Sequence, residues 1–285
     1  MLRLVLIIPV FVTTLALLMA ASIALGNQRD YPPLVYVVRA DPHDEIRMLD
    51  LNTGFWIEVA RNESFGVIDV SSAGDILVTT HAPVGSILNT VTPALIDVAH
   101  GIDDNPTWSP AADRIAYRRY YYQGGLYVYT RGQWPPRPLR IRATAITWSP
   151  DGHLLAYSRW NDTSDQEEIR MVDVRTRADA GLIAGWRKPV RYMRWSPDGK
   201  HIALTTIAGE FYLLDVQDKT FTQLLVDTQH VRSAQWSADG ALLGVISTSR
   251  GQSMLTVLDE THQIRDQFPL DALSRTSSFD WWSTQ

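Results

Sequence analysis

The chain has 285 residues, enough for one large all-β domain or two small ones, and its composition is that of an ordinary globular protein. It contains no cysteine, which excludes disulfides, thiolate metal ligands, a cysteine nucleophile and a lipid anchor on cysteine. Its net charge of −5 disfavours a general nucleic-acid-binding protein, so no nucleic-acid partner is expected.

Residues 1–26 contain an uncharged, mostly apolar run from Leu4 to Leu25. A signal peptide would end at a small-residue cleavage site such as Ala24-Leu25-Gly26. A membrane-spanning helix needs about 20 apolar residues, and the length of this run favours that interpretation. Because Arg3 flanks the run, we expect a single-pass anchor with a cytoplasmic N-terminus.

Either interpretation places the remainder of the protein on the extracytoplasmic side, as an anchored domain or as a secreted one. Residues 27–33 are mostly polar and end in Tyr31-Pro32-Pro33, which indicates a short, stiffened linker. The folded domain is then expected over residues 34–285.

A short phrase, Trp-Ser-Pro-Asp-Gly, recurs along residues 34–285. The copies, complete or degenerate, start at Val70, Trp108, Trp148, Trp195, Trp236 and Trp282. Within the phrase, proline suits the second position of a type I turn, serine opens the turn and glycine closes it. Apolar or β-branched runs flank each copy, so each one predicts a β-hairpin.

The flanking runs predict the strands in chain order. The first unit has three strands, at 34–38, 45–50 and 55–59, and no hairpin phrase precedes it. The second unit has strands at 67–70, 76–79 and 94–97, with a loop at 81–92. The third unit has strands at 107–108, 114–122, 126–129 and 139–142. Further units cover 145–184, 190–226 and 233–268, and residues 277–282 repeat the opening strand once more.

The copies are separated by 38 to 47 residues, a period typical of four-stranded propeller blades. The first unit lacks its opening strand, and the C-terminus supplies a spare one. Together they predict an all-β, six-bladed propeller whose last blade is shared between the two chain ends, preceded by one hydrophobic helix. A solenoid is the alternative, although its units are usually shorter or helical.

The phrase, the apolar strand after it and the segment Glu168–Val174 resemble the WD-like propeller repeat of TolB-type proteins over residues 34–285. The resemblance implies a rigid protein-binding platform in the cell envelope. Some similar propellers are fused to hydrolases. TolB proteins carry an additional α/β domain before the propeller, for which residues 1–33 leave no room, so TolB's specific role is not implied.

Two repeated features are expected to be structural. The tryptophans of the opening strands should pack between blades. An aspartate ends most of the predicted third strands and should accept hydrogen bonds from nearby backbone amides. These aspartates are Asp50, Asp97, Asp173, Asp215 and Asp259.

The least repeat-like surface candidate lies in the third unit, in a hairpin and the loop expected after it. Arginine and aromatic residues are enriched at binding hot spots, so this segment is our candidate protein interface. Its residues are Arg118, Arg119, Tyr120, Tyr121, Tyr122, Trp134 and Arg137. The alternative is a half-buried strand with two solvated arginines.

The charge of the chain is unevenly distributed. Residues 113–200 hold 16 Lys and Arg against 9 Asp and Glu, whereas the rest of the chain holds 10 against 22. A basic sector of this kind could face an acidic partner or an anionic lipid, or it could reflect a chance distribution.

No motif predicts a catalytic, metal or cofactor site. The acidic stretch 161–168 lacks the spacing of a calcium loop and is better read as a hairpin tip. We therefore expect a protein-binding platform or accessory subunit of an envelope complex that is not an enzyme and has no cofactor. The alternatives are a propeller-type hydrolase or lactonase with a site at the channel mouth, and a sensor or carrier of a small ligand.

Overall fold

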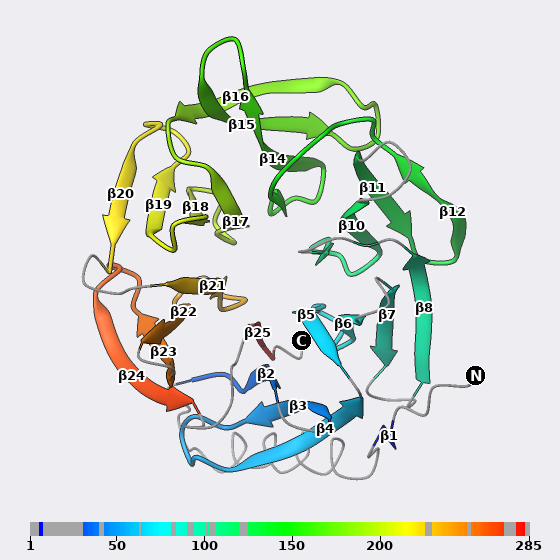
Figure 1. Ribbon diagram of the computed structural model, residues 1–285, viewed down its shortest axis with the longest axis vertical. Helices are drawn as coiled ribbons and strands as arrows, with labels where there is room; N and C mark the ends of the chain where they lie inside the picture. Colours follow the sequence, from blue (N-terminus) through cyan, green and yellow to red (C-terminus); the bar gives the residue numbers. More distant parts are fainter. Residues whose placement is uncertain are drawn as a thin grey trace.

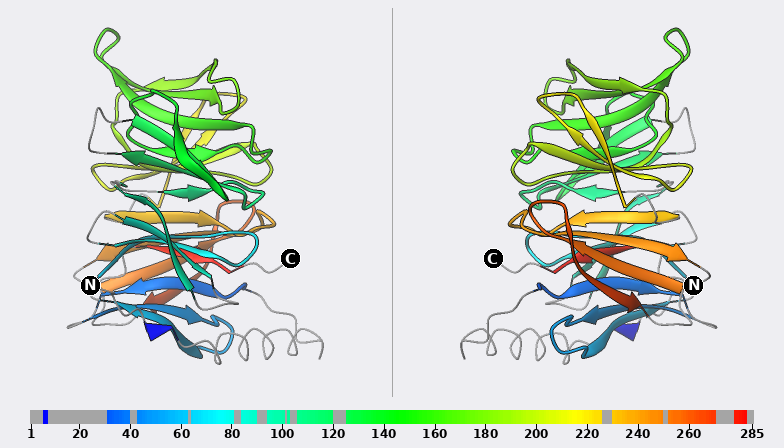
Figure 2. Two further views of the ribbon diagram at one scale, coloured as in Figure 1. Left: turned by 90° about the vertical axis from the view of Figure 1, so that its right-hand side faces the viewer. Right: turned by 90° about the vertical axis from the view of Figure 1, so that its left-hand side faces the viewer.

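The computed structural model describes residues 6–7, 31–39, 43–62, 64–80, 84–89, 94–100, 102, 106–119, 125–225, 230–249, 252–270 and 278–282. The described residues form six antiparallel sheets arranged radially around a central channel, as in a propeller (Figure 1). Seen from the side, the sheets stack as the blades of a thick disc (Figure 2). The all-β, six-bladed prediction is confirmed.

In blades 2 to 6 the chain runs from the channel outward. Blade 2 comprises β5 (Phe65–Val70), β6 (Ile76–Thr80), β7 (Val84–Asn89) and β8 (Ala94–His100). Blade 3 comprises β9 (Thr107–Trp108), β10 (Arg114–Arg119), β11 (Gly125–Thr130) and β12 (Gln133–Pro138). Blade 4 comprises β13 (Ile146–Trp148), β14 (Leu154–Asn161), β15 (Gln166–Asp173) and β16 (Asp179–Trp186). Blade 5 comprises β17 (Val190–Trp195), β18 (His201–Thr206), β19 (Phe211–Asp215) and β20 (Phe221–Leu224). Blade 6 comprises β21 (Val231–Trp236), β22 (Leu243–Ser249), β23 (Gln252–Leu258) and β24 (Ile264–Leu270).

Blade 1 is built from both ends of the chain. Its strands from the channel outward are β25 (Phe279–Trp281), β2 (Leu34–Val38), β3 (Asp44–Leu49) and β4 (Trp56–Asn62). β25 pairs antiparallel with β2, with Leu34 opposite Trp281. Phe279 is fully buried and Trp281 is 3% exposed. The predicted shared-blade closure is therefore confirmed.

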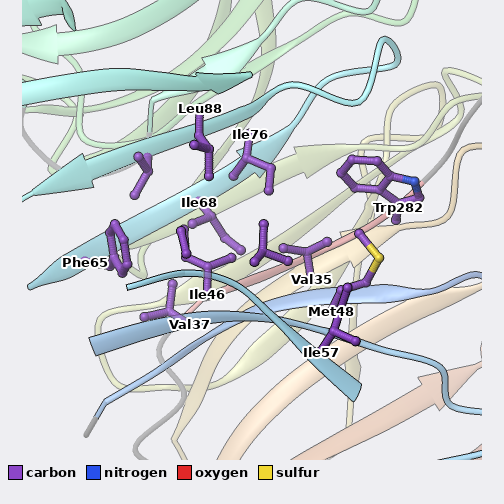
Figure 3. Packing of buried hydrophobic residues seen from close by; sticks show 13 residues of the cluster. Val35, Val37, Ile46, Met48, Ile57, Phe65, Ile68, Ile76, Leu88 and Trp282 are labelled. Carbon is purple, nitrogen blue, oxygen red and sulfur yellow. The ribbon is translucent and has the colours of Figure 1, made fainter. Parts of the chain in front are cut away.

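The interface between blades 1 and 2 shows how this closure is stabilised. Trp282 packs with Val35 and Met48 of blade 1 and Ile76 of blade 2 in one buried cluster (Figure 3). Side chains from residues near both chain ends thus share a core with the following blade. Burying this apolar surface ties the ring together without any covalent link.

The recurring turns have the predicted geometry. In blade 4 the N–H of Gly152 donates to the carbonyl of Ser149 (2.9 Å), and Gly152 has a φ of +70°. The Ser149 hydroxyl accepts a second bond from the N–H of Leu154 (2.9 Å). All of these turns join the innermost strand of a blade to the next strand, so they lie on one face of the disc.

The repeated tryptophans and aspartates have the expected structural roles. The indole N–H of Trp148 donates to the carbonyl of Thr107 in the neighbouring blade (3.1 Å). Asp173 and Asp215 each accept a bond from a backbone N–H three residues further along, at 2.6 and 2.7 Å. Asp97 is an exception to the pattern, because it lies in the fourth strand of blade 2.

Three details of the predicted blades were wrong. In blade 2 the segment expected as a loop contains β7, because Ile87 and Leu88 are buried and the strand pairs on both sides despite its Gly and Ser. In blade 3 the outer strand begins at Gln133, and Trp134 lies in it. This is possible because prolines are tolerated in an edge strand. Trp281, and not Trp282, aligns with the repeated tryptophans, since its indole N–H donates to Gln235 of the preceding blade (3.0 Å).

The expected helix over residues 4–25 is not supported. Its two described residues form β1 (Leu6–Ile7), which pairs with β4 at the outer edge of blade 1. An open sheet edge offers unpaired backbone groups to such a segment. The rest of residues 1–30 lies outside the described residues. Among those described, no helix is long and apolar enough to cross a membrane.

Candidate functional site: the polar floor of the central channel

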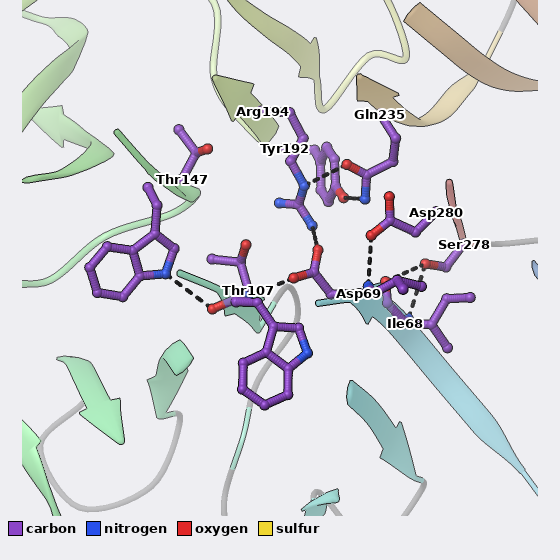
Figure 4. Close-up of polar contacts among 12 residues, drawn as sticks. Ile68, Asp69, Thr107, Thr147, Tyr192, Arg194, Gln235, Ser278 and Asp280 are labelled. Atoms are coloured by element: carbon purple, nitrogen blue, oxygen red, sulfur yellow. Dashed lines mark hydrogen bonds and ion pairs between the residues drawn. The ribbon is translucent and has the colours of Figure 1, made fainter. Parts of the chain in front are cut away.

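The channel is narrowed by one side chain from each blade. In every blade this residue comes directly before the repeated tryptophan or its equivalent, at the same position of the innermost strand. The six residues are Asp69, Thr107, Thr147, Arg194, Gln235 and Asp280, and we call them the channel ring. Their strands converge on the axis, so side chains distant in sequence become neighbours (Figure 4).

The side chains of the channel ring accept hydrogen bonds from backbone N–H groups of the innermost strands. Each innermost strand pairs with only one other strand of its blade, so some of its N–H groups face the channel. Asp280 Oδ2 accepts from the N–H of Val70 (2.7 Å), and Asp69 Oδ2 accepts from the N–H of Trp108 (2.6 Å). Thr147 Oγ1 accepts from the N–H of Trp195 (3.0 Å). Each bond joins one blade to the next, and an unpaired buried N–H would be costly.

Arg194 spans the channel. Its Nη2 donates to Asp69 Oδ1 at 2.8 Å, although the two residues come from blades 5 and 2, on opposite sides of the ring. Its Nε donates to Gln235 Oε1 at 2.8 Å, and its guanidinium lies 4.4 Å from the ring centre of Tyr192. Arg194 and Asp69 are both buried. The guanidinium therefore lies across the channel at this level (Figure 4).

The channel ring contains two carboxyl groups and one cation. Burial raises the pKa of Asp280 to about 8, and the nearby charge of Asp69 adds to this rise. Burial also raises the pKa of Asp69, but the charge of Arg194 and the Trp108 N–H oppose that effect. Since Asp69 holds the direct contact with Arg194, Asp280 is the group that keeps a proton near neutral pH.

Above this floor lies a cavity of about 370 Å³ that opens on the face carrying the recurring turns. We call it the funnel. Its walls come from the turns and the repeated tryptophans, and Pro110, Pro197 and Ala238 form part of its exposed rim. The floor offers a carboxyl group and hydroxyl groups for hydrogen bonding. No three His, Asp or Glu side chains among the described residues lie close enough to hold a metal ion.

The structure separates the residues of the predicted interface. The guanidinium of Arg118 donates from Nη1 to the carbonyls of Ala143 (3.1 Å) and Thr144 (2.6 Å). The Arg119 guanidinium lies 5.4 Å from the ring centre of Tyr127. These two arginines lie at the end of blade 3 that faces away from the recurring turns.

Trp134 and Arg137 belong to the outer strand β12. Trp134 is 70% exposed and lies near the end of blade 3 that carries the turn, since Gln133 pairs with Thr130. Arg137 donates to the carbonyl of Arg175 in blade 4 (2.9 Å). Tyr120, Tyr121 and Tyr122 lie outside the described residues. The predicted interface is thus not one contiguous set around Arg118.

The channel ring was not predicted from the sequence. A signal was available, since each ring residue comes one position before the Trp of the repeated phrase. The residue type varies from blade to blade, however, so the position does not look like a motif. Only ring closure brings an aspartate of blade 2 against an arginine of blade 5.

No protein-family model matches the chain. Among solved structures, TolB from Acinetobacter baumannii superposes with a TM-score of 0.74 at 14% identity, covering 92% of this chain and 69% of that one. The protein has the TolB-type propeller fold. A putative TolB from Agrobacterium tumefaciens gives a TM-score of 0.68 at 14% identity and covers 83% of this chain and 89% of that one.

Two further relatives differ from TolB. A chain of a nidogen–laminin complex matches the TolB-type propeller of this protein with a TM-score of 0.69 at 11% identity, over 89% of this chain and 99% of that one. Among curated sequences, the uncharacterized peptidase YuxL of Bacillus subtilis is 28% identical over 148 residues. That match covers 48% of this chain and only 22% of YuxL.

Proposed function

We propose that this protein is an extracytoplasmic protein-binding platform whose partner docks on the face of the recurring turns and inserts a side chain into the funnel. The observation that carries the proposal is the funnel itself, which opens at one face and has the buried Arg194–Asp69 pair across its floor. A buried ion pair across the floor favours a socket over an open passage. A volume of about 370 Å³ lies at the small end of ligand pockets and suits one anchoring side chain.

The chemistry of the funnel favours binding over catalysis. Among the described residues that line it there is no histidine, and the reactive groups are carboxyl, hydroxyl, amide and guanidinium. The guanidinium is already engaged by Asp69 and Gln235. YuxL is named a peptidase, but the match spans a minor part of that protein, so we do not extend peptidase activity to this chain.

The likeness to TolB propellers and to a chain of a nidogen–laminin complex supports a role in protein–protein interaction. We further propose that residues 4–25 anchor the protein in the membrane, with Leu6 and Ile7 leaving the edge of blade 1, so that the partner is an envelope or membrane protein. N-terminal sequencing of the mature protein tests the anchor. A mature chain that starts near Asn27 would contradict it.

The docking face is tested by photo-crosslinking in the native cells. A photoreactive amino acid replaces Ala238 on the funnel rim or, as a matched control, Ala180 on the outer strand of blade 4; both positions are exposed. We expect a discrete adduct with an envelope protein from position 238 and none from position 180. Equal labelling from both positions, or none from the rim, would refute the docking face.

A further inference from the structure

A second concave surface lies on the other face of the disc, at the end of blades 3 and 4 that points away from the recurring turns. It is a groove of about 600 Å³ between the loop after β12 and the far end of β14. Its floor includes the buried Tyr157. The funnel and this groove share no lining residue, so they are independent sites.

One wall of the groove is a loop held in a fixed shape. The carbonyl of Leu126 accepts from the N–H of Leu139 (2.8 Å), and the N–H of Leu126 donates to Ile141 (2.9 Å). Leu139 and Ile141 thus both bond to Leu126, and Arg140 between them is the extra residue of a bulge. Arg140 has a φ of +60°, a conformation that favours glycine.

Two arginines of this loop point outward, whereas Ile141 between them packs against a buried cluster. Arg140 and Arg142 are exposed and form no ion pair with any described residue. The loop itself is held from below by Arg118, which bonds the carbonyls of Ala143 and Thr144. The predicted interface residue Arg118 therefore supports this wall instead of forming the contact surface.

The opposite wall is the end of β14. Arg159 faces Glu168 across the strand pair and donates to Glu168 Oε2 from Nε (3.1 Å) and Nη2 (3.0 Å). Trp160 beside it is 41% exposed and lines the groove. The charged residues that line the groove are Arg140, Arg142, Arg159 and Asp162. Arg140 and Arg142 have no acidic partner in the part of the chain that the structure describes, whereas Arg159 pairs with Glu168.

We propose that this groove binds an extended acidic segment of a partner protein. Arg140 and Arg142 would pair with its carboxylates, and Trp160 would contact an apolar residue between them. The groove lies within the sector of residues 113–200 that carries the positive excess of the chain. A concave surface with two walls fits an extended chain, whereas a lipid surface would be contacted by a protruding basic face.

The backbone conformation at Arg140 provides a test of the proposal. A glycine would fit the left-handed bulge without strain, yet the position holds an arginine whose side chain is exposed. Arg177 has a similar φ of +64° in an ordinary turn, so this conformation does not by itself mark a binding site. Substitution by glycine should then separate the two roles, since it removes the charge while relaxing the backbone.

The test uses the full-length protein in detergent and a fluorescein-labelled octapeptide of alternating glutamate and leucine. A glutamine–leucine peptide is the uncharged counterpart. We expect saturable, salt-sensitive binding of the acidic peptide alone. We expect R140E/R142E to weaken it about tenfold or more. Arg140→Gly should weaken binding while leaving the thermal midpoint unchanged or raised.

The matched control is Arg177→Glu. Arg177 is an exposed arginine of the same basic sector with a φ of +64°, but it lies in the β15–β16 turn on the opposite face. This variant should bind the acidic peptide as the unaltered protein does.

Three results would overturn the proposal. One is no binding of the acidic peptide, and another is an equal loss of affinity in Arg177→Glu and R140E/R142E. The third is binding to vesicles containing phosphatidylglycerol, lost in R140E/R142E, without peptide binding; this would assign the groove to lipid. None of these results bears on crosslinking at Ala238, which tests the funnel separately.

Discussion

Arg194 Nη2 and Asp69 Oδ1 lie 2.8 Å apart, at the centre of a ring whose blades place them on opposite sides. Both side chains are more than nine-tenths buried. A pair in this position does two things. It joins blades 2 and 5, which share no strand pairing, and it gives the funnel its floor.

Removing one member of this pair should be strongly destabilising. In Asp69→Ala the Arg194 cation stays buried without a counter-charge, and the N–H of Trp108 loses its acceptor. We expect a loss of about 3–5 kcal/mol in the free energy of unfolding. Urea titration measures it. Lys200→Ala, which breaks an exposed pair with Asp198, is the control and should cost less than about 1 kcal/mol. Similar losses in the two variants would contradict the role of the buried pair.

Asp280 should make stability depend on pH. The folded protein keeps a proton on Asp280 up to about pH 8, whereas the unfolded chain releases it near the ordinary pKa of 3.8. The folded state therefore binds the extra proton between these values, so the contribution of Asp280 to stability is greatest below the lower pKa and falls as pH rises toward 8. One such group contributes a slope of at most about 1.4 kcal/mol per pH unit.

The variant Asp280→Asn isolates this contribution. Its amide oxygen can still accept the bond from Val70, but it does not titrate. The free energy of unfolding, measured by urea titration from pH 4 to pH 8, should then fall less with rising pH than it does in the unaltered protein. An unchanged slope would assign the pH dependence to other groups.

Deletion of residues 279–285 should abolish cooperative folding of the ring. The deletion removes β25, its pairing with Leu34–Tyr36 and the buried Phe279. It also removes Asp280 and exposes the inner edge of β2. Thermal unfolding followed by circular dichroism measures the effect. A truncated protein with the same midpoint would show that the shared blade is dispensable.

Two tryptophans should differ sharply in their contribution to stability. Trp281 is 3% exposed and bonds Gln235, whereas Trp134 is 70% exposed on the outer strand of blade 3. Trp281→Ala should cost about 3–5 kcal/mol, as expected for a large side chain removed from a core. Trp134→Ala should change stability by no more than about 0.5 kcal/mol. Guanidinium titration of both variants compares them directly. Equal losses would place Trp134 in a packed environment.

The strands and hairpins of the blades could be predicted from the sequence because each hairpin is a local structure. In the phrase that begins at Trp148, proline sets one φ angle, glycine permits another and serine satisfies the turn, all within a few residues. The spacing between copies of this turn then gave the repeat period of the blades. The first unit lacks its opening strand and the C-terminus supplies one, which together implied a closed ring. Where local signals were weak, as at β7 and β12, strand boundaries were misplaced.

The two candidate sites were not readable in the same way. Arg194 and Asp69 are separated by 125 positions, and nothing near either residue in the sequence indicates its partner. Likewise nothing near Arg140 in the sequence indicates its left-handed backbone or its place in a loop that is hydrogen-bonded to Leu126. The sequence by itself determined turn type, repeat and blade count, because these follow from neighbouring residues. Only the tertiary structure decided the channel floor and the basic groove, because both depend on which blades face one another once the ring has closed.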